Sequence, residues 1–428
     1  MGFSSPVNLG STIFIGYQLD SFFAVTAPGL ETFTAEELRL LFLDSKPGTS
    51  SSEIKIRGME TDRQSEAGEI ILQMKSHFTP KTESGGVTFK GTLTDLYRAN
   101  LHLRTSSRIL ARLGNFFYAT TFPELQKRLV RLPWERFLTA GQPISIRVTC
   151  HRSKLYHSGA VASTLLTALA ERLGQPSPVI KLDEESDRQP QLVVVRLADD
   201  KCTVSVDSSG SLLHKRGYRQ AVAKAPLRET LAAAMLMASG WDRVSPLLDP
   251  FCGSGTIPIE AALMSLGIPP GKNRRFAFMD WPGFDSQLWE SVRSKVTPIQ
   301  PSSFALPPIM ASDRDAGAIK MAQANAERAG VVETIEFKCQ AVSYITPPPG
   351  PGWIVTNPPY GLRVSEGKDL RNLYAQFGNV LREKCPAWNL SVLCNDRVLL
   401  GQLQLKLDTS QSMVNGGMRV MMGRGIVR

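Results

Sequence analysis

The second half of the chain alternates short apolar runs with segments in which apolar residues recur at helical spacing. The apolar runs lie at 244–250, 308–313, 334–339, 353–357 and 390–394, and the helix-like segments include 316–329 and 370–384. Short apolar runs are typical of buried strands, so the alternation predicts an α/β unit with a mostly parallel sheet between helices. A closing hairpin is predicted from segments 404–407 and 418–422, which flank Asn415-Gly-Gly417.

The first half mixes strands and helices less regularly. Strands are predicted at 22–30, 68–74, 86–91, 108–113, 143–149, 191–197 and 201–206, with helices at 35–42, 94–103, 125–130 and 157–173. Segment 45–69 is rich in Ser, Gly and charged residues, which predicts a mobile insertion. Together these patterns predict three domains, at 20–114, 115–210 and 211–428.

The composition excludes several classes of protein. No run of about 18 apolar residues occurs, so a membrane span is not expected. Residues 1–30 contain neither Lys nor Arg, which argues against a secretory signal or a transit peptide and predicts a cytoplasmic protein. A chloroplast or another organelle is the alternative if this start is incomplete. The six cysteines form no Cys-x-x-Cys pair, so reduced, mostly buried thiols are expected and no metal site.

The net charge of +10 is concentrated in one stretch. Residues 101–160 contain ten basic residues and two acids, a local charge of 10 − 2 = +8. Such a stretch attracts phosphate groups through counterion release, although an ordinary solvated surface is the alternative. The candidate contacts to nucleic-acid phosphates are Arg128, Arg131, Arg152 and Lys154.

A glycine turn follows the first strand of the alternating half. The sequence Asp249-Pro-Phe-Cys-Gly-Ser-Gly-Thr256 leads from an apolar run into the helix-like segment 257–264. The two glycines remove side-chain bulk where a backbone must approach a ligand, and N–H groups at a helix start can bind it. The turn therefore indicates a small-ligand site, with a plain structural turn as the alternative.

A second motif, Asn357-Pro-Pro-Tyr360, follows the strand predicted at 353–357. An aromatic amine is a poor nucleophile because its lone pair is delocalised into the ring. The side-chain oxygen of Asn357 and the carbonyl of Pro358 can bind its two N–H groups, orient the lone pair and stabilise the charge that develops. The prolines make the loop rigid, and Tyr360 can stack on a base.

Together the two motifs resemble the S-adenosylmethionine (SAM) site and the amino-methylating loop of the Asn-Pro-Pro-Tyr methyltransferases. Segments 23–30, 103–109 and 121–125 resemble the N-terminal half of THUMP-containing guanine-N2 RNA methyltransferases. The likeness covers most of residues 20–428, without 45–70. It implies a ferredoxin-like segment and an α/β THUMP domain that bind RNA, followed by a Rossmann-like SAM-dependent methyltransferase domain. The bacterial enzymes acting on large-subunit rRNA, with their plant counterparts, are the most similar.

The resemblance implies roles for individual residues. The cofactor would be held by Asp249, Pro250, Phe251, Cys252, Gly253, Gly255, Thr256, Asp313, Gln340, Ala341 and Asn357, and the catalytic loop is Asn357, Pro358, Pro359 and Tyr360. Asp313 would accept the ribose hydroxyls, while Asp315 is predicted to cap the following helix. Gln340 stands where many relatives have an acid for the adenine amine, and its amide oxygen can still accept. Segment 219–226 would approach the methionine carboxylate.

The sequence leaves two questions open: the role of two basic residues and the identity of the methyl acceptor. Arg363 and Lys368 are either phosphate contacts or part of a surface loop. Asn-Pro-Pro-Tyr also occurs in adenine-N6 DNA methyltransferases and in enzymes that methylate a glutamine side chain, so only the RNA-binding character of the first half favours RNA. Guanine N2 of rRNA is the first hypothesis and guanine N2 of tRNA the second. An RNA-binding adapter with an inactive fold is the third; intact Asp249 and Asn357 argue against it, and Gln340 favours it.

Overall fold

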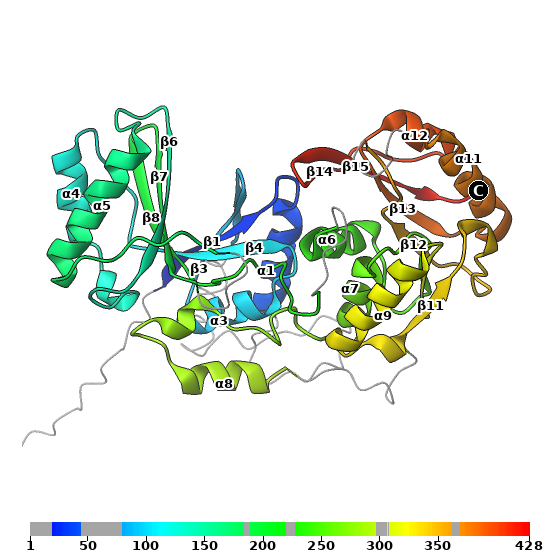
Figure 1. The fold of residues 1–428 in the computed structure, drawn as a ribbon, viewed down its shortest axis with the longest axis horizontal. Coiled ribbons are helices and arrows are strands. Elements are labelled where there is room, and N and C mark those ends of the chain that lie inside the picture. Colours follow the sequence, from blue (N-terminus) through cyan, green and yellow to red (C-terminus); the bar gives the residue numbers. More distant parts are fainter. Residues whose placement is uncertain are drawn as a thin grey trace, which may run out of the picture.

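The computed structural model describes residues 19–43, 79–183, 189–219, 227–296, 306, 308–361 and 369–428. These residues form two units, one around each of two sheets, side by side in Figure 1. The predicted insertion at 45–69, the strand at 68–74, and Arg363 and Lys368 lie outside the described residues.

The first sheet has eight strands. They are β1 (Asp20–Thr26), β2 (Lys81–Glu83), β3 (Gly86–Gly91), β4 (Ser106–Arg112), β5 (Phe117–Tyr118), β6 (Ile144–His151), β7 (Gln191–Ala198) and β8 (Lys201–Asp207). The order is β2-β3-β1-β4-β8-β7-β6, with β5 paired to β8, and within it β6 and β7 run parallel. Because β4 pairs with β8, one sheet runs through the predicted division near residue 115, and that division stays a prediction.

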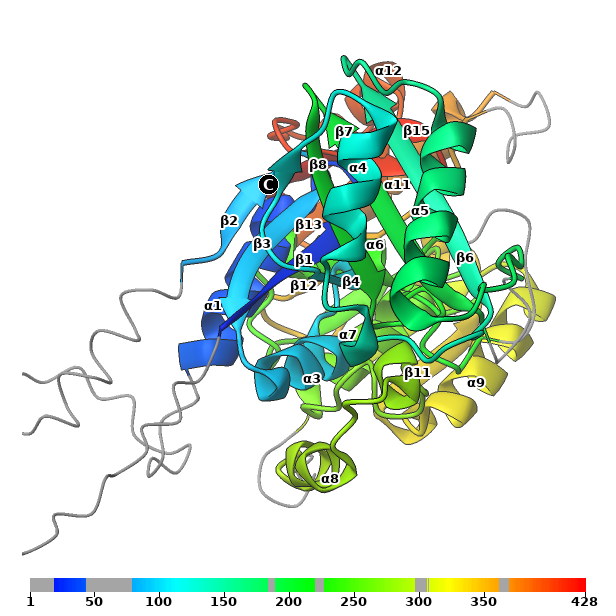
Figure 2. The same cartoon turned by 90° about the vertical axis from the view of Figure 1, so that its left-hand side faces the viewer.

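Among the described residues, four helices before residue 210 belong to this first unit. They are α1 (Glu31–Leu43), α3 (Leu93–His102), α4 (Phe122–Val130) and α5 (Ser158–Leu173), with the short turn η1 (Trp134–Arg136) between α4 and α5. Thr92 and Asp95 form a reciprocal capping box at the start of α3, which ties the helix start to its own first turn. Figure 2 shows α4 and α5 in front of strands β6 to β8.

The second sheet has the predicted doubly wound pattern. Its strands are β9 (Leu247–Asp249), β10 (Ile309–Asp313), β11 (Ile335–Cys339), β12 (Trp353–Thr356), β13 (Asn389–Cys394), β14 (Ser412–Asn415) and β15 (Met418–Ile426). The order is β11-β10-β9-β12-β13-β15-β14; the first five strands are parallel, and β15 runs antiparallel to its neighbours. The hairpin prediction was wrong in its first strand, since β15 pairs with 412–415 and not with 404–407.

Helices cover both faces of this sheet. They are α6 (Glu229–Ser239), α7 (Thr256–Ser265), α9 (Ala316–Ala329), α11 (Arg371–Lys384) and α12 (Arg397–Gln402), with short turns η4 (Val332–Thr334) and η5 (Val342–Tyr344). The turn η2 (Ala277–Asp280) and helix α8 (Ser286–Ser294) come from the same half of the chain but pack against the first unit. All three residues of β9 and five of the six in β13 are buried, as a parallel sheet with two covered faces requires. None of the helices in the described part of the chain is long and apolar enough to span a bilayer.

An aromatic segment of the second half packs back onto the first unit. The ring of Tyr97 in α3 stacks on Phe278, with centroids 4.4 Å apart, and meets Trp289 of α8 edge-on at 5.8 Å. Phe276 and Trp281 complete this buried cluster. The core of the first sheet therefore contains residues from beyond the domain division predicted at 211.

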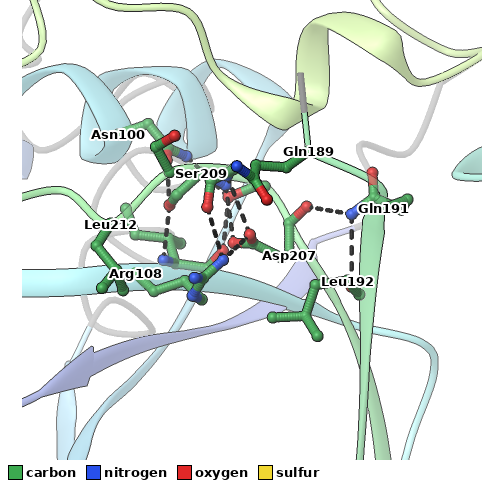
Figure 3. A network of polar contacts seen from close by, with 12 residues as sticks. Asn100, Arg108, Gln189, Gln191, Leu192, Asp207, Ser209 and Leu212 are labelled. Atoms are coloured by element: carbon green, nitrogen blue, oxygen red, sulfur yellow. Dashed lines mark hydrogen bonds and ion pairs between the residues drawn. The ribbon is translucent and has the colours of Figure 1, made fainter. Parts of the chain in front are cut away.

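A polar network fixes the chain where it leaves β8 (Figure 3). Asp207 forms a buried ion pair with Arg108 and accepts hydrogen bonds from the backbone N–H groups of Ser209 (2.9 Å) and Gly210 (3.0 Å). The hydroxyl of Ser209 donates to the Asn100 side chain at 2.7 Å. Burial raises the pKa of Asp207, and the Arg108 guanidinium opposes that shift. The linker to the second sheet is thus held at a defined angle.

Candidate active site

Four strands of the second sheet end at one edge with polar residues. Asp249 ends β9, Asp313 ends β10, Gln340 follows β11, and Thr356 ends β12. These parallel strands are neighbours in the order β11-β10-β9-β12, so their carboxyl ends form one continuous rim. Ligands of open α/β sheets bind at this edge. The structure thereby brings together the residues that the sequence predicted for a cofactor site.

The glycine turn between β9 and α7 is fixed from two sides. The Gly253 N–H donates to Asp313 Oδ2 at 3.0 Å, and the Asn325 side chain in α9 donates to the Ser254 carbonyl at 3.0 Å. Gly255 has φ +81°, and a Cβ there would lie 3.0 Å from the Cβ of Ala322. Gly253 also has a positive φ, +50°, but faces open space. The turn is therefore a rigid cradle with room for a ligand beside Gly253.

The carboxylate of Asp249 is buried beneath this cradle, with 1% of the residue exposed. Its Oδ1 accepts hydrogen bonds from the Thr356 hydroxyl at 2.7 Å and from the Phe251 N–H at 3.2 Å. Burial raises the pKa of Asp249 to about 7, which the two hydrogen bonds oppose and the nearby charge of Asp313 reinforces. A cationic ligand would favour the ionised form. Thr356, to which the sequence analysis gave no role, joins the strand end before the glycine turn to the Asn-Pro-Pro-Tyr loop.

SAM binding is expected to depend on pH through Asp249. The folded-state pKa, about 7, lies above the ordinary 3.8, so this group's contribution to stability is present below about pH 4 and lost as the pH rises through about 7. Ionisation favours the cationic cofactor, so affinity should rise up to about tenfold per unit between pH 5 and 7. Calorimetry at pH 6 in two buffers should detect proton release, absent in Asp249→Asn. A flat affinity from pH 5 to 8 would contradict this role.

The acids after β10 have separate functions. Oδ1 of Asp313 accepts from the Asp315 N–H at 3.0 Å, and the carbonyl of Asp313 accepts from the Gln340 N–H at 3.0 Å. Asp315 caps α9 by accepting from the Gly317 N–H at 2.7 Å, as predicted. Asp313 is thus held at the rim, where its remaining lone pairs suit ribose hydroxyls, while Gln340 and Ala341 lie partly exposed beside it. The ribose and adenine contacts stay predictions.

The side-chain oxygen of Asn357 is buried and has no hydrogen-bond partner among the described residues. Leaving a buried carbonyl unpaired costs about 1–3 kcal/mol, which a ligand with an N–H group would recover. The Pro359 carbonyl accepts from the Tyr374 hydroxyl at 3.2 Å, which fixes the loop from α11. This unpaired acceptor at the rim is what an amine-binding site requires.

Tyr360 is more buried than a base-stacking residue needs to be. Only 5% of the residue is exposed, and its hydroxyl accepts from the Asn415 side chain at 2.9 Å. Burial raises the pKa of Tyr360, so the phenol stays neutral. The contact with Asn415 anchors the loop to the β14–β15 hairpin. The stacking function of Tyr360 stays a prediction.

Arg219 approaches the cradle from the linker. Its Nη2 donates to the Thr256 hydroxyl at 2.7 Å and to the Leu227 carbonyl at 2.8 Å, and its Nε lies 3.4 Å from Glu229 at the start of α6. Residues 220–226 of the predicted methionine-carboxylate segment lie outside the described residues. The sequence analysis gave no role to Glu229. An acid in the first turn of a helix that follows a basic segment is a pattern that could have indicated this ion pair.

The predicted basic surface divides into two sets. Arg128 and Arg131 at the end of α4, and Arg152 and Lys154 after β6, are exposed and make no ion pair with a described residue, and the same holds for Lys127 and Arg147. Four others are paired with acids: Arg104, Arg108, Arg112 and Arg136 bind Glu260, Asp207, Glu83 and Asp20. The positive charge that is free to bind a polynucleotide is therefore smaller than the +8 counted for residues 101–160. The structure places the exposed set on the first unit, apart from the rim of the second sheet.

Three domain models match the chain. The RMKL-like methyltransferase domain matches residues 216–423, the RlmL ferredoxin-like domain matches 73–110, and the THUMP domain matches 119–207. They cover the two described units and the predicted active site.

Individual relatives extend this match. A Synechocystis sp. protein, slr0064, provisionally named as an RNA methyltransferase, is 33% identical over 340 residues, which are 79% of this chain and 88% of the relative. The ribosomal RNA large subunit methyltransferase K/L of Methylococcus capsulatus is 33% identical over 348 residues, 79% of this chain. This chain spans about half of that longer enzyme (46%). The solved structure of SMU.472, provisionally named as a methyltransferase and complexed with SAH, has 27% identity and a TM-score of 0.77, covering 96% and 98% of the two chains.

Proposed function

This chain belongs to the RMKL-like methyltransferase family with ferredoxin-like and THUMP domains, and from that premise we propose that it methylates the exocyclic N2 amine of a guanine in large-subunit rRNA. SAM is the methyl donor. The main observation in support of this chemistry is that Oδ1 of Asn357 is buried and has no hydrogen-bond partner among the described residues. This oxygen lies at the same sheet edge as Asp249 and the glycine cradle. We propose the same domain division as before: 20–114, 115–210 and 211–428.

The loop after β12 performs the chemistry through hydrogen-bond acceptors. Asn357 Oδ1 and the Pro358 carbonyl accept the two N–H groups of the amine, which turns its lone pair toward the methyl donor. As positive charge develops on the nitrogen, both acceptors stabilise it. The Pro359 carbonyl, held by the Tyr374 hydroxyl, keeps this geometry without reorganisation. The proton leaves to solvent after transfer, so no strong general base is needed.

The residues of the cradle fit the cofactor. SAM supplies an electrophilic methyl group when it is bound. Gly253 and Gly255 leave room for the backbone to approach it, and the buried Asp249 carboxylate favours its positive charge. Asp313 accepts from the ribose, and the amide oxygen of Gln340 accepts from the adenine amine. The remaining contacts proposed for the cofactor come from Pro250, Phe251, Cys252, Thr256 and Ala341.

The choice of RNA rests on the first unit and on the relatives. A THUMP domain model matches residues 119–207, and the relative from Methylococcus capsulatus is named for large-subunit rRNA. The exposed cations Arg128, Arg131, Arg152 and Lys154 would bind phosphates, and the target base must leave its stack to reach Asn357. Guanine N2 of tRNA is the alternative acceptor.

The proposed function is tested by identifying the product. The full chain is incubated with labelled SAM and either rRNA or tRNA, and the digested nucleosides are separated by mass spectrometry. N2-methylguanosine formed from rRNA is the expected result, and mapping of the modified position then defines the target. N6-methyladenosine as the product, or no transfer to any RNA, would overturn the proposal.

Charge reversal at Arg128 and Arg131 together is expected to weaken RNA binding about tenfold or more at physiological salt, because two phosphate contacts are lost. The slope of log affinity against log salt should become less steep by about one to two. The matched control is reversal at Lys295 and Lys406, two exposed cations of the second half that make no ion pair with a described residue, with the same net change. An unchanged slope in the first variant would mark Arg128 and Arg131 as ordinary surface.

A further inference from the structure

A second asparagine lies beside the catalytic loop. Asn395 follows β13, which pairs in parallel with β12 so that Thr356 is opposite Val392. A Cβ added to Gly361, directly after Tyr360, would lie 3.4 Å from the Asn395 Nδ2. Asn357 and Asn395 therefore follow the ends of adjacent parallel strands, and the Asn395 side chain lies beside the loop that begins at Asn357.

The side chain of Asn395 is unpaired although its neighbours are not. The Tyr374 hydroxyl lies 3.5 Å from Cys394 Sγ, and the Asp396 N–H donates to the same sulfur at 3.4 Å. Asp396 caps α12 by accepting from the Val398 N–H at 2.7 Å. In contrast, Oδ1 of Asn395 is buried and has no hydrogen-bond partner in the part of the chain that the structure describes. The contacts of Cys394 and Asp396 thus fix this turn, and the Asn395 Oδ1 takes no part in them.

Among the side chains that the structure describes, Asn357 and Asn395 are the two with a buried amide oxygen lacking any partner. Unpaired buried acceptors are rare because each costs about 1–3 kcal/mol. Two such oxygens at the ends of neighbouring strands indicate a ligand that presents adjacent N–H donors. The Watson–Crick edge of guanine does so, with the N2 amine next to N1–H.

We propose that Asn395 is a specificity residue whose Oδ1 accepts the N1–H of the target guanine while Asn357 holds its N2 amine. This inference rests on the proposed function. Adenine carries no hydrogen at N1, so its lone pair would face the Asn395 oxygen, and a buried acceptor opposite an acceptor disfavours binding. Asn395 would therefore select guanine without taking part in the transfer itself.

The test uses 2-aminopurine, which keeps the 2-amine but has no hydrogen at N1. Two synthetic RNAs carry the mapped target position as guanine or as 2-aminopurine, and kcat/KM is measured for both. The wild-type enzyme should prefer guanine by about 10- to 100-fold, the loss expected for one unpaired polar group. Asn395→Ala should lower kcat/KM on guanine by a similar factor, while kcat/KM on 2-aminopurine should stay the same or rise, because the acceptor that opposes its N1 lone pair is removed. Asn395→Asp retains an acceptor and should keep the preference for guanine.

Asn389→Ala is the matched control, because Asn389 begins the same strand at the end away from the rim. It should leave both substrates unchanged, and SAM binding by each variant shows that it is folded. An equal loss on both RNAs in Asn395→Ala, or no guanine preference in the wild type, overturns this inference alone. A product other than N2-methylguanosine removes the proposed function and this inference together. Should Asn395→Ala fail to fold, the wild-type preference and Asn395→Asp still decide the question.

Discussion

Asn357→Ala is expected to lower kcat about a thousandfold while SAM affinity changes by no more than a few-fold. The Asn357 oxygen is a preorganised acceptor for an amine whose charge develops in the transition state, and removing one such group typically costs about 10²–10³ in kcat. The same oxygen also orients the attacking amine, so its removal should lower kcat further. Asp249 and the glycine cradle do not depend on this side chain for their hydrogen bonds, so the cofactor should remain bound.

The measurement pairs single-turnover methyl transfer with calorimetry of SAM binding. Asn379→Ala on the exposed side of α11 is the control for loss of an asparagine elsewhere in the same unit, and it should leave both quantities unchanged. Turnover within about tenfold of the wild type in Asn357→Ala would refute the proposed chemistry. A parallel collapse of SAM affinity would instead assign Asn357 mainly to the cofactor.

The sequence predicted the second sheet well because its signals are local. A buried parallel strand is a continuous apolar run, and the glycine turn after Asp249 needs two left-handed residues in a short span, so both are visible without knowing the fold. The fold class, the family and the cofactor inferred from these motifs are confirmed. The wrong strand at 404–407 has a physical cause. Leu405 and Leu407 pack against the core as strand residues would, yet hydrogen bonding to β15 begins only with the single bridge at Asp408.

Contacts between segments that are far apart in the chain could not be predicted from the sequence. Arg104 and Arg108 counted toward the basic stretch, because a sum of charges does not reveal that Glu260 and Asp207 neutralise them. The same applies to Asn395, whose unpaired oxygen is noticeable only once its neighbours are seen to be bonded. The sequence pattern therefore indicated the groups that we propose to react but not the contacts that position them.

The largest expected effect on stability is at Glu260, which joins the two units. This residue of α7 is fully buried, and its carboxylate lies 3.6 Å from Arg104 Nη1 and 3.5 Å from Arg216 Nε. The Tyr218 hydroxyl donates to it at 3.3 Å. Arg104 comes from the first unit, whereas α7 begins at the cofactor cradle. The cluster therefore links the first unit to the candidate active site.

Glu260→Ala should lower the free energy of unfolding by about 3–5 kcal/mol, because two buried guanidinium groups would lose the carboxylate that lies between them. Burial already lowers the pKa of Arg104, and the Glu260 charge is the largest influence that opposes this shift. Denaturant unfolding measures the loss, with Glu327→Ala on the exposed side of α9 as the control. A loss below about 1 kcal/mol, as for a surface pair, would show that the cluster does not hold the units together. Where the variant folds, RNA methylation should fall further than SAM affinity, since the cradle keeps its own hydrogen bonds while the first unit loses its anchor.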